Sequence, residues 1–195
     1  MRFHLTYAGP LKSNGSPAHK HQIRKAFHPQ LCKLWSLNPH LFQVFPENFL
    51  DPFPTPEQFL NSRADKYESA GFRWLPLIDS GDGVRVGIDI LMLRDGPAGG
   101  IVLRNGDIDN RLKTLFDAFQ IPEHKESLPP GAAPDEGEDP FCCFLQDDKL
   151  IGRVAVETDT LLQPVNDKSC VNPNDVRLFI SVEIQSIGGM NSRFS

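Results

Sequence analysis

Hydrophobic and polar residues follow two clear periods in the first 35 positions. Residues 2–7 alternate between polar and apolar side chains, which is typical of a strand with one buried face. Over residues 17–35 the apolar positions recur every three or four residues instead, which predicts a helix. Pro29 lies inside this helix and should kink or restart it, because proline lacks the backbone N–H that a helix interior uses.

The middle of the chain combines proline-rich connections with further strand patterns. Residues 38–58 hold five prolines among several phenylalanines, which suits an ordered connection rather than a regular element. Residues 72–78 and 84–93 flank the turn-forming sequence of residues 79–83 and predict a β-hairpin. The glycines of this turn do not indicate a phosphate-binding loop, because a strand pattern follows them and no helix pattern does.

The second half of the chain contains the clearest helix. Apolar residues lie on one face of residues 107–119, and Asp107 is placed to act as the N-cap. Residues 121–148 carry eight acidic residues and one basic residue, with five prolines, so we expect a mobile acidic insertion over about 121–144. Residues 150–158 and 176–184 read as strands, and about 187–195 as a tail.

Length and composition fit one globular domain spanning residues 1–195. The 195 residues are 39% hydrophobic and 23% charged. No apolar run approaches the roughly 18 residues that cross a bilayer, and the first thirty residues lack the apolar core of a secretory signal. We therefore expect a cytoplasmic protein without a membrane partner.

Charge is distributed unevenly along the chain. Residues 1–46 hold six basic residues and no acidic one, which gives this segment a charge of +6. Because the whole chain has a net charge of −5, the remaining residues carry −11 (−5 minus +6). Because salt screens fields beyond about 10 Å, a basic flank can bind nucleic acid although the whole chain is acidic. A solvated basic helix face is the equally weighted alternative.

The four cysteines, Cys32, Cys142, Cys143 and Cys170, form no C-x-x-C pair. This spacing does not indicate a disulfide framework or a typical zinc site, so we expect reduced thiols. A metal site built from Cys142, Cys143 and a distant histidine stays open, but small buried strand residues are the favoured interpretation.

Polar residues on the clearest helix and downstream of it are the best candidates for chemistry. Asp109, Asn110, Lys113 and Asp117 form a stripe opposite the apolar face, and Asp147 and Asp148 follow later. Carboxylates about 5 Å apart repel by roughly 3 kcal/mol per pair at an effective dielectric near 20, and a divalent cation removes this repulsion. Such a cluster suggests Mg²⁺, which suits phosphodiester hydrolysis. The alternative is an exposed ion pair between Asp109 and Lys113, worth about 0.3 kcal/mol.

The same residues resemble the signature of the RusA-type Holliday junction resolvases. The resemblance comprises Asp107-Ile108-Asp109-Asn110, Lys113, Phe116-Asp117-Ala118 and Leu145-Gln146-Asp147-Asp148. It implies that Asp107, Asp109 and Asp148 bind the catalytic metal, and that Lys113 assists catalysis. We expect Asp147 to be less important, its side chain pointing away from that of Asp148 if the pair is extended.

A second part of the resemblance is the segment from Gly9 to Asn14, which is similar to the loop after the family's first strand. With the basic helix, it gives Lys12, Asn14, Lys20, Arg24 and Lys25 as candidate nucleic-acid contacts. The acidic insertion is longer than the family's connection, and no basic run precedes the aspartate motif. The insertion is read as a solvated loop, with a lid that repels nonspecific DNA as the alternative.

The resemblance implies an α+β fold, with a small mixed or antiparallel sheet and two main helices packed on it. It implies a homodimeric endonuclease of DNA recombination and repair, which uses Mg²⁺ (with Mn²⁺ as substitute) to cut branched DNA such as Holliday junctions. A catalytically silent module that binds nucleic acid or protein is the alternative.

Overall fold

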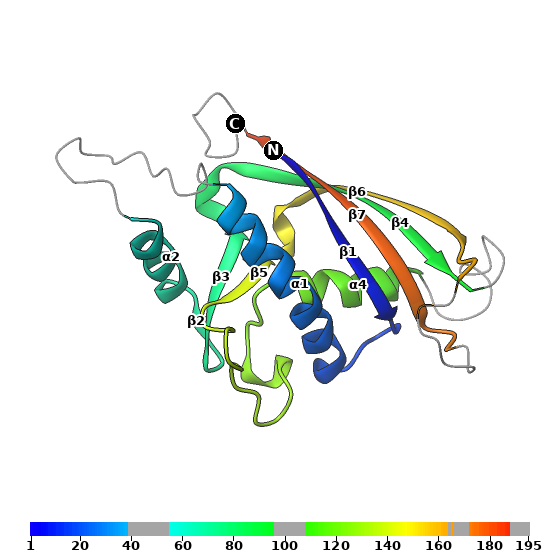
Figure 1. Cartoon of the computed structure of the whole chain (residues 1–195), viewed down its shortest axis with the longest axis horizontal. Coiled ribbons are helices and arrows are strands. Elements are labelled where there is room, and N and C mark those ends of the chain that lie inside the picture. The colour runs from blue at the N-terminus through cyan, green and yellow to red at the C-terminus, as the bar shows by residue number, and fades with distance from the viewer. Residues whose placement is uncertain (39–54, 96–107, 164, 166–171, 188–195) are drawn as a thin grey trace.

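The fold belongs to the α+β class, with two sheets and three α-helices in the part of the chain that is described. The computed structural model describes residues 1–38, 55–95, 108–163, 165 and 172–187 (Figure 1). The helices are α1 (Pro17–Leu37), α2 (Pro56–Asp65) and α4 (Ile108–Phe119). The strands are β1 (Arg2–Pro10), β2 (Glu68–Ser69), β3 (Phe72–Ile78), β4 (Val84–Arg94), β5 (Phe141–Leu145), β6 (Ile151–Thr160) and β7 (Asp175–Ser186).

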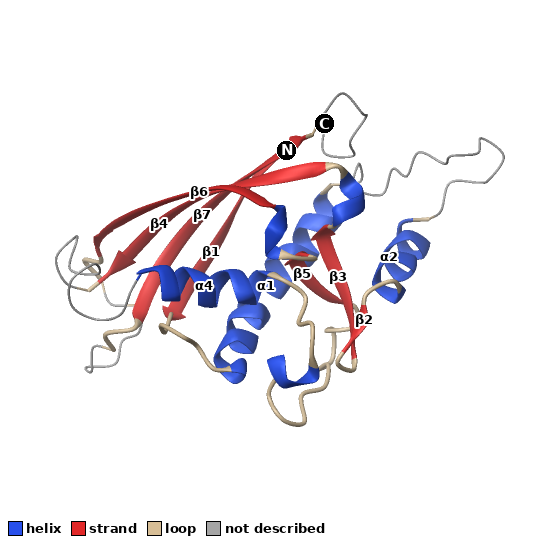
Figure 2. Ribbon diagram, turned by 180° about the vertical axis from the view of Figure 1, so that it is seen from behind, coloured by secondary structure: helices blue, strands red, loops and turns tan. Residues whose placement is uncertain are grey.

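The larger sheet has the strand order β1-β7-β4-β6. Strand β7 runs antiparallel to both β1 and β4, while β6 runs parallel to β4. Residues of β1 are alternately exposed and buried, as the period of two predicts. Helices α1 and α4 lie on the same side of this sheet (Figure 2), so its apolar positions face them.

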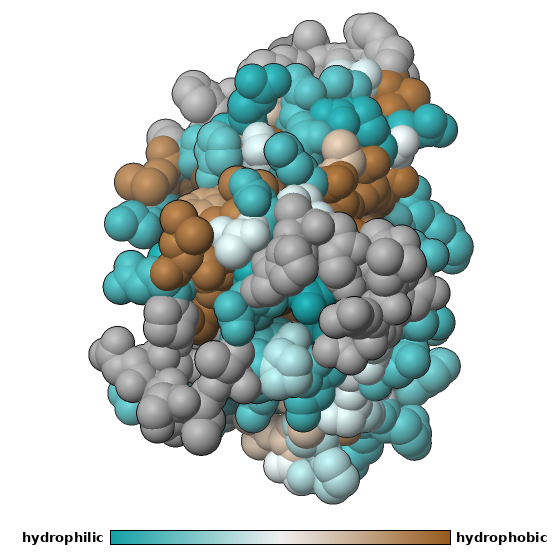
Figure 3. All heavy atoms as spheres, turned by 90° about the vertical axis from the view of Figure 1, so that its right-hand side faces the viewer, coloured by the Kyte–Doolittle hydropathy of each residue, from teal (hydrophilic) through white to brown (hydrophobic). Residues whose placement is uncertain are grey.

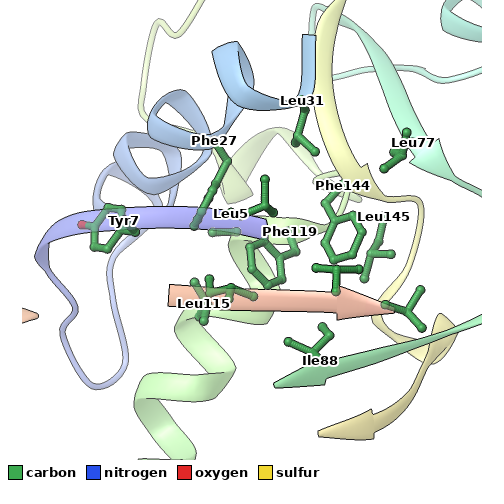
Figure 4. Close-up of a cluster of buried hydrophobic side chains, with 14 of the residues drawn as sticks. Leu5, Tyr7, Phe27, Leu31, Leu77, Ile88, Leu115, Phe119, Phe144 and Leu145 are labelled. Carbon is green, nitrogen blue, oxygen red and sulfur yellow. The ribbon is translucent and has the colours of Figure 1, made fainter. Parts of the chain in front are cut away.

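The core forms where these helices meet the sheet. Phe27 of α1 lies with its ring 5.2 Å from that of Phe119 of α4, and Phe119 is 5.3 Å from Phe144 of β5. Leu5 of β1 and Ile88 of β4 contribute from the sheet side (Figure 4). The observed α4 matches the helix predicted over 107–119, because its apolar spacing places one face in this core.

The predicted hairpin of residues 72–78 and 84–93 is wrong. Strand β3 belongs to a second sheet of order β2-β3-β5, in which it runs parallel to β5, whereas β4 lies in the larger sheet. The connecting turn contains the short 3₁₀ helix η2 (Ser80–Asp82). Arg63 of α2 holds this turn through ion pairs of 2.8 Å to Asp79 and 3.0 Å to Asp82, so the two strands diverge.

The insertion predicted over about 121–144 ends earlier in the structure, because a strand begins at Phe141. Its last residues form β5, which is buried along its whole length. The proline and acidic residues around Phe141–Leu145 hid this strand, because a short apolar run has no diagnostic period. The remainder contains the 3₁₀ helix η3 (Lys125–Ser127) and contacts α1, since Lys25 pairs with Asp135 at 2.5 Å and with Glu138 at 3.0 Å.

No helix among the described residues is both long and apolar enough to cross a membrane. The side of the molecule seen in Figure 3 shows hydrophobic residues in separate groups between hydrophilic ones. The expectation that residues 38–58 form no regular element is wrong at its end, because helix α2 begins at Pro56. Residues 39–54 and the proposed tail from 188 lie outside the described part, so the interpretations placed on them stay predictions.

Candidate functional site

A groove of about 410 Å³ lies between the first half of α1, the end of α4 and the turn after β5. Helix α1 contributes Lys20 and Arg24, and α4 contributes Asp117. Asp147 and Asp148 line it from the turn. These five ionisable side chains come from three segments that are distant from one another in sequence.

Local hydrogen bonds fix the turn that carries the two adjacent aspartates. Asp147 is the N-cap of the 3₁₀ helix η4 (Asp148–Leu150), and its side chain accepts a hydrogen bond from the Lys149 backbone N–H at 2.9 Å. The Asp148 backbone N–H donates to Gln120 Oε1, just after α4, at 3.1 Å. The turn is thereby held against the end of α4.

The carboxyl groups of Asp147 and Asp148 influence each other, since the charge of Asp147 helps to raise the pKa of Asp148. Asp147 itself is extended, with φ −151° and ψ 146°, whereas Asp148 begins a 3₁₀ helix, so the pair is extended only in part. The expectation that the Asp147 side chain points away from that of Asp148 stays a prediction.

The surroundings of Asp148 in the groove raise the pKa of its carboxyl group. Partial desolvation is the largest cause, and the negative charges of Asp147 and Asp117 add to it. The pKa of Asp147 is instead lowered, first by the Lys149 backbone N–H. The site therefore holds more carboxylate than its own cations balance, which is the condition that divalent cation binding relieves.

Basic groups of α1 line the opposite wall. Lys20 Nζ lies 2.6 Å from a carboxylate oxygen of Asp117, and both side chains are about one quarter exposed, at 26% and 21%. Arg24 is only 3% exposed and donates from Nη2 to the Asp117 carbonyl oxygen at 2.6 Å. Its Nε and Nη1 have no hydrogen-bond partner, and burial lowers its pKa to about 10.

The three predicted metal ligands, Asp107, Asp109 and Asp148, do not all lie in the groove. Asp148 lines the groove, while Asp107 lies outside the described residues. Asp109 is exposed in the first turn of α4, eight residues before Asp117, which corresponds to about 12 Å along the helix axis. The described geometry therefore places Asp117 beside Asp148 and Asp109 at the far end of the helix. Lys113 lies exposed between them.

The predicted nucleic-acid contacts also divide into groups. Lys20 and Arg24 line the groove, whereas Lys25 pairs with the acidic segment. Lys12 and Asn14 belong to the loop before α1, where the Lys12 backbone N–H donates to His19 Nε2 at 3.2 Å and Asn14 has a left-handed φ of 52°.

Sequence reasoning placed Asp117 on the polar stripe of its helix but gave it no role. The signal that could have given it one was its position near the end of the helix. Its closeness to Asp147 and Asp148 in space depends on strand β5, which the sequence pattern did not predict.

The cysteines form a second polar cluster. The expectation of reduced thiols is corrected by a disulfide between Cys32 of α1 and Cys142 of β5. The ligand atoms of His28, Cys32 and Cys142 all lie within 4.8 Å of one another. Cys143 is a buried free thiol, and Cys170 lies outside the described residues. The distance between 32 and 142 in sequence explains why spacing did not reveal the bond.

No family model matches this chain, and comparison with curated proteins and with solved structures gives no match either.

Proposed function

We propose that the chain is a Mg²⁺-dependent endonuclease acting on branched DNA, with the groove between α1 and α4 as its active site. The observation that carries the proposal is the convergence of Lys20, Asp117, Asp147 and Asp148 in one groove. The sequence resemblance to RusA-type resolvases supplies the substrate class, and the groove supplies chemistry that suits it.

The donor set fits a hard divalent cation. Asp117 and Asp148 would hold Mg²⁺, because carboxylate oxygens are its preferred protein ligands and leave positions for water and phosphate. When bound, Mg²⁺ supplies a polarised phosphoryl oxygen and a water activated for attack. The residues present fit such an ion, since Asp117, Asp147 and Asp148 line one groove and the negative charges of Asp147 and Asp117 add to partial burial in raising the pKa of Asp148, a cost that a bound cation would reduce.

The protein's own groups have separate tasks. Asp148 can act as a ligand only as the carboxylate, so activity should rise with pH through its raised pKa. Lys20, once its carboxylate partner Asp117 is occupied, can offset charge on the phosphate. Arg24 holds the end of α4 through the Asp117 carbonyl and thereby positions that aspartate.

Lys12 and Asn14 extend the same surface toward the DNA strand, because their loop leads into Pro17 at the edge of the groove. Two such active sites in a homodimer would allow both opposed strands of a junction to be cut. The silent binding module becomes the better proposal if the groove binds DNA without cleaving it.

A cleavage assay on end-labelled four-way junctions tests the proposal, with duplex and single-stranded DNA as comparisons and EDTA as the metal-free control. We expect Asp148→Asn and Asp117→Asn to abolish Mg²⁺-dependent cleavage while junction binding is retained or tightened. Mn²⁺ binding measured by calorimetry should weaken in the same variants.

Asp109→Asn is the matched variant on the same helix. Cleavage retained in Asp109→Asn and lost in Asp117→Asn supports the groove as the metal site. If Asp107→Asn and Asp109→Asn lose cleavage while Asp117→Asn stays active, the result supports the ligand set that the resemblance implies. Wild-type protein that binds neither Mg²⁺ nor Mn²⁺ and cuts no DNA would contradict the enzyme proposal altogether.

A further inference from the structure

Two cysteines and a histidine meet where the middle of α1 crosses β5. The disulfide between Cys32 and Cys142 spans 110 residues of sequence and joins Cα atoms 5.7 Å apart. His28 lies one helical turn before Cys32, and its ring nitrogens are 3.6 and 3.7 Å from Cys32 Sγ. None of these three residues lines the groove.

Hydrogen bonds to His28 favour thiol chemistry over metal binding at this cluster. Its Nδ1 accepts a bond from the Cys142 backbone N–H at 2.9 Å, so that lone pair is used. The proton of the neutral ring then lies on Nε2, which is 3.2 Å from the Gly137 carbonyl oxygen. An imidazole bonded in this way offers no free lone pair to an ion.

The two sulfur atoms differ in access. Cys32 is partly exposed on α1, whereas Cys142 is 4% exposed within β5. Among the described residues, Cys32 is therefore the side of the bond that a small reagent can reach. Cys143, the next residue in β5, contrasts with both: burial raises the pKa of its thiol to about 12, so it stays protonated and unreactive.

The crosslink joins the two elements that lead into the groove. Helix α1 carries Lys20 and Arg24, and β5 leads within five residues of Cys142 to Asp147. Core packing between Phe27, Phe119 and Phe144 surrounds the same junction and holds it independently of the sulfur bond. The fold can therefore persist when the disulfide opens.

We propose that Cys32 and Cys142 form a reversible thiol–disulfide site that exchanges with low-molecular-weight thiols and disulfides through Cys32. In the oxidising direction, the Cys32 thiolate attacks a small disulfide and displaces one thiolate. The Cys142 thiolate then attacks Cys32 Sγ of the mixed disulfide and displaces the second. Two protein thiols and one small disulfide become one protein disulfide and two small thiols. The reverse sequence reduces the bond.

The test uses the full-length native protein equilibrated in glutathione buffers from fully reduced to fully oxidised. Free thiols are trapped by alkylation and assigned by peptide mass spectrometry. We expect Cys32 and Cys142 to convert together within this range, while Cys143 stays a thiol throughout.

Single variants identify the point of attack. Cys142→Ser in oxidised glutathione should accumulate a glutathione adduct on Cys32, whereas Cys32→Ser should leave Cys142 largely unmodified. Cys143→Ser is the matched control and should not shift the transition. Circular dichroism of each variant checks that it is folded.

Two results would overturn the proposal. A pair that stays oxidised in excess reduced glutathione until the protein is unfolded is a fixed structural disulfide. A pair that stays reduced in excess oxidised glutathione forms no disulfide at all. The thiol readout needs neither DNA nor metal, so its outcome is independent of the proposed nuclease activity.

Discussion

Arg63 shows how one buried residue decides the path of the chain. Its guanidinium is 8% exposed and donates to the Pro76 carbonyl oxygen at 2.8 Å in addition to its pairs with Asp79 and Asp82. We expect Arg63→Met to lower the free energy of unfolding by about 3–5 kcal/mol, because Asp79 and Asp82 stay buried without the guanidinium that pairs with both. Urea denaturation measures this loss.

The matched control is Arg73→Met, whose pair with Asp65 at 3.0 Å is more exposed and should contribute about 0–1 kcal/mol. Burial is the largest single influence and acts to raise the pKa of Asp79, but the charges of Arg63 and Lys66 and hydrogen bonds from Tyr67 and the Gly81 backbone together outweigh it, so the pKa is lowered. The pair's contribution is therefore present above the ordinary carboxyl pKa and is lost as pH falls through the lowered value. Equal losses in the two variants would contradict the assigned role of Arg63.

For Asp148 we expect stability to change with pH in the opposite direction to that expected for Asp79. Its raised pKa means that the folded state favours the proton, so stability falls as pH rises from the ordinary carboxyl pKa through the raised one. Asp148→Asn should raise the melting temperature at pH 7 without divalent cations, and the gain should vanish at pH 3. Asp147→Asn should instead lower it, since the lowered pKa of Asp147 means that the folded state favours the negative charge that asparagine lacks. Calorimetry at both pH values gives the comparison.

At the scale of elements, α1 presents its basic residues unequally. From sequence alone, replacing Lys20, Arg24 and Lys25 together should flatten the slope of log K for DNA binding against log salt by about 2.7, at roughly 0.9 per phosphate contact on duplex DNA. In the structure Arg24 is buried and Lys25 is held by Asp135 and Glu138, a hydrogen bond to the former raising its pKa. Lys20 lines the groove and pairs with one carboxylate, whereas Lys25 pairs with two outside it, so Lys20 is the contact that we expect DNA to use.

Lys20→Ala should therefore flatten the slope by about 0.9, and Lys25→Ala should leave it unchanged. Fluorescence anisotropy with a labelled junction in EDTA, at several salt concentrations, measures both slopes. A slope altered by Lys25→Ala and unaffected by Lys20→Ala would place the DNA on the other side of α1.

At the scale of the whole molecule, the proposed function requires two active sites. We expect light scattering to give a mass near twice the 21.8 kDa of the chain, at least when a four-way junction is bound. The protein alone and a linear duplex of equal length are the controls. A strict monomer on every DNA would remove junction resolution from the proposal and leave a simpler nuclease.

The sequence by itself determined the elements whose side chains repeat with a backbone period. The alternation in β1 and the three-and-four spacing of α4 each place apolar groups on one face, which is a local consequence of strand and helix geometry. The acidic residues that suggest a cation were equally visible, although Asp117 could not be given a role. Only tertiary structure separated β3 from β4, joined Cys32 to Cys142 and brought Asp117 beside Asp148. These outcomes depend on contacts between segments distant in sequence, and such contacts are decided by the packing of the whole core, which no local period encodes.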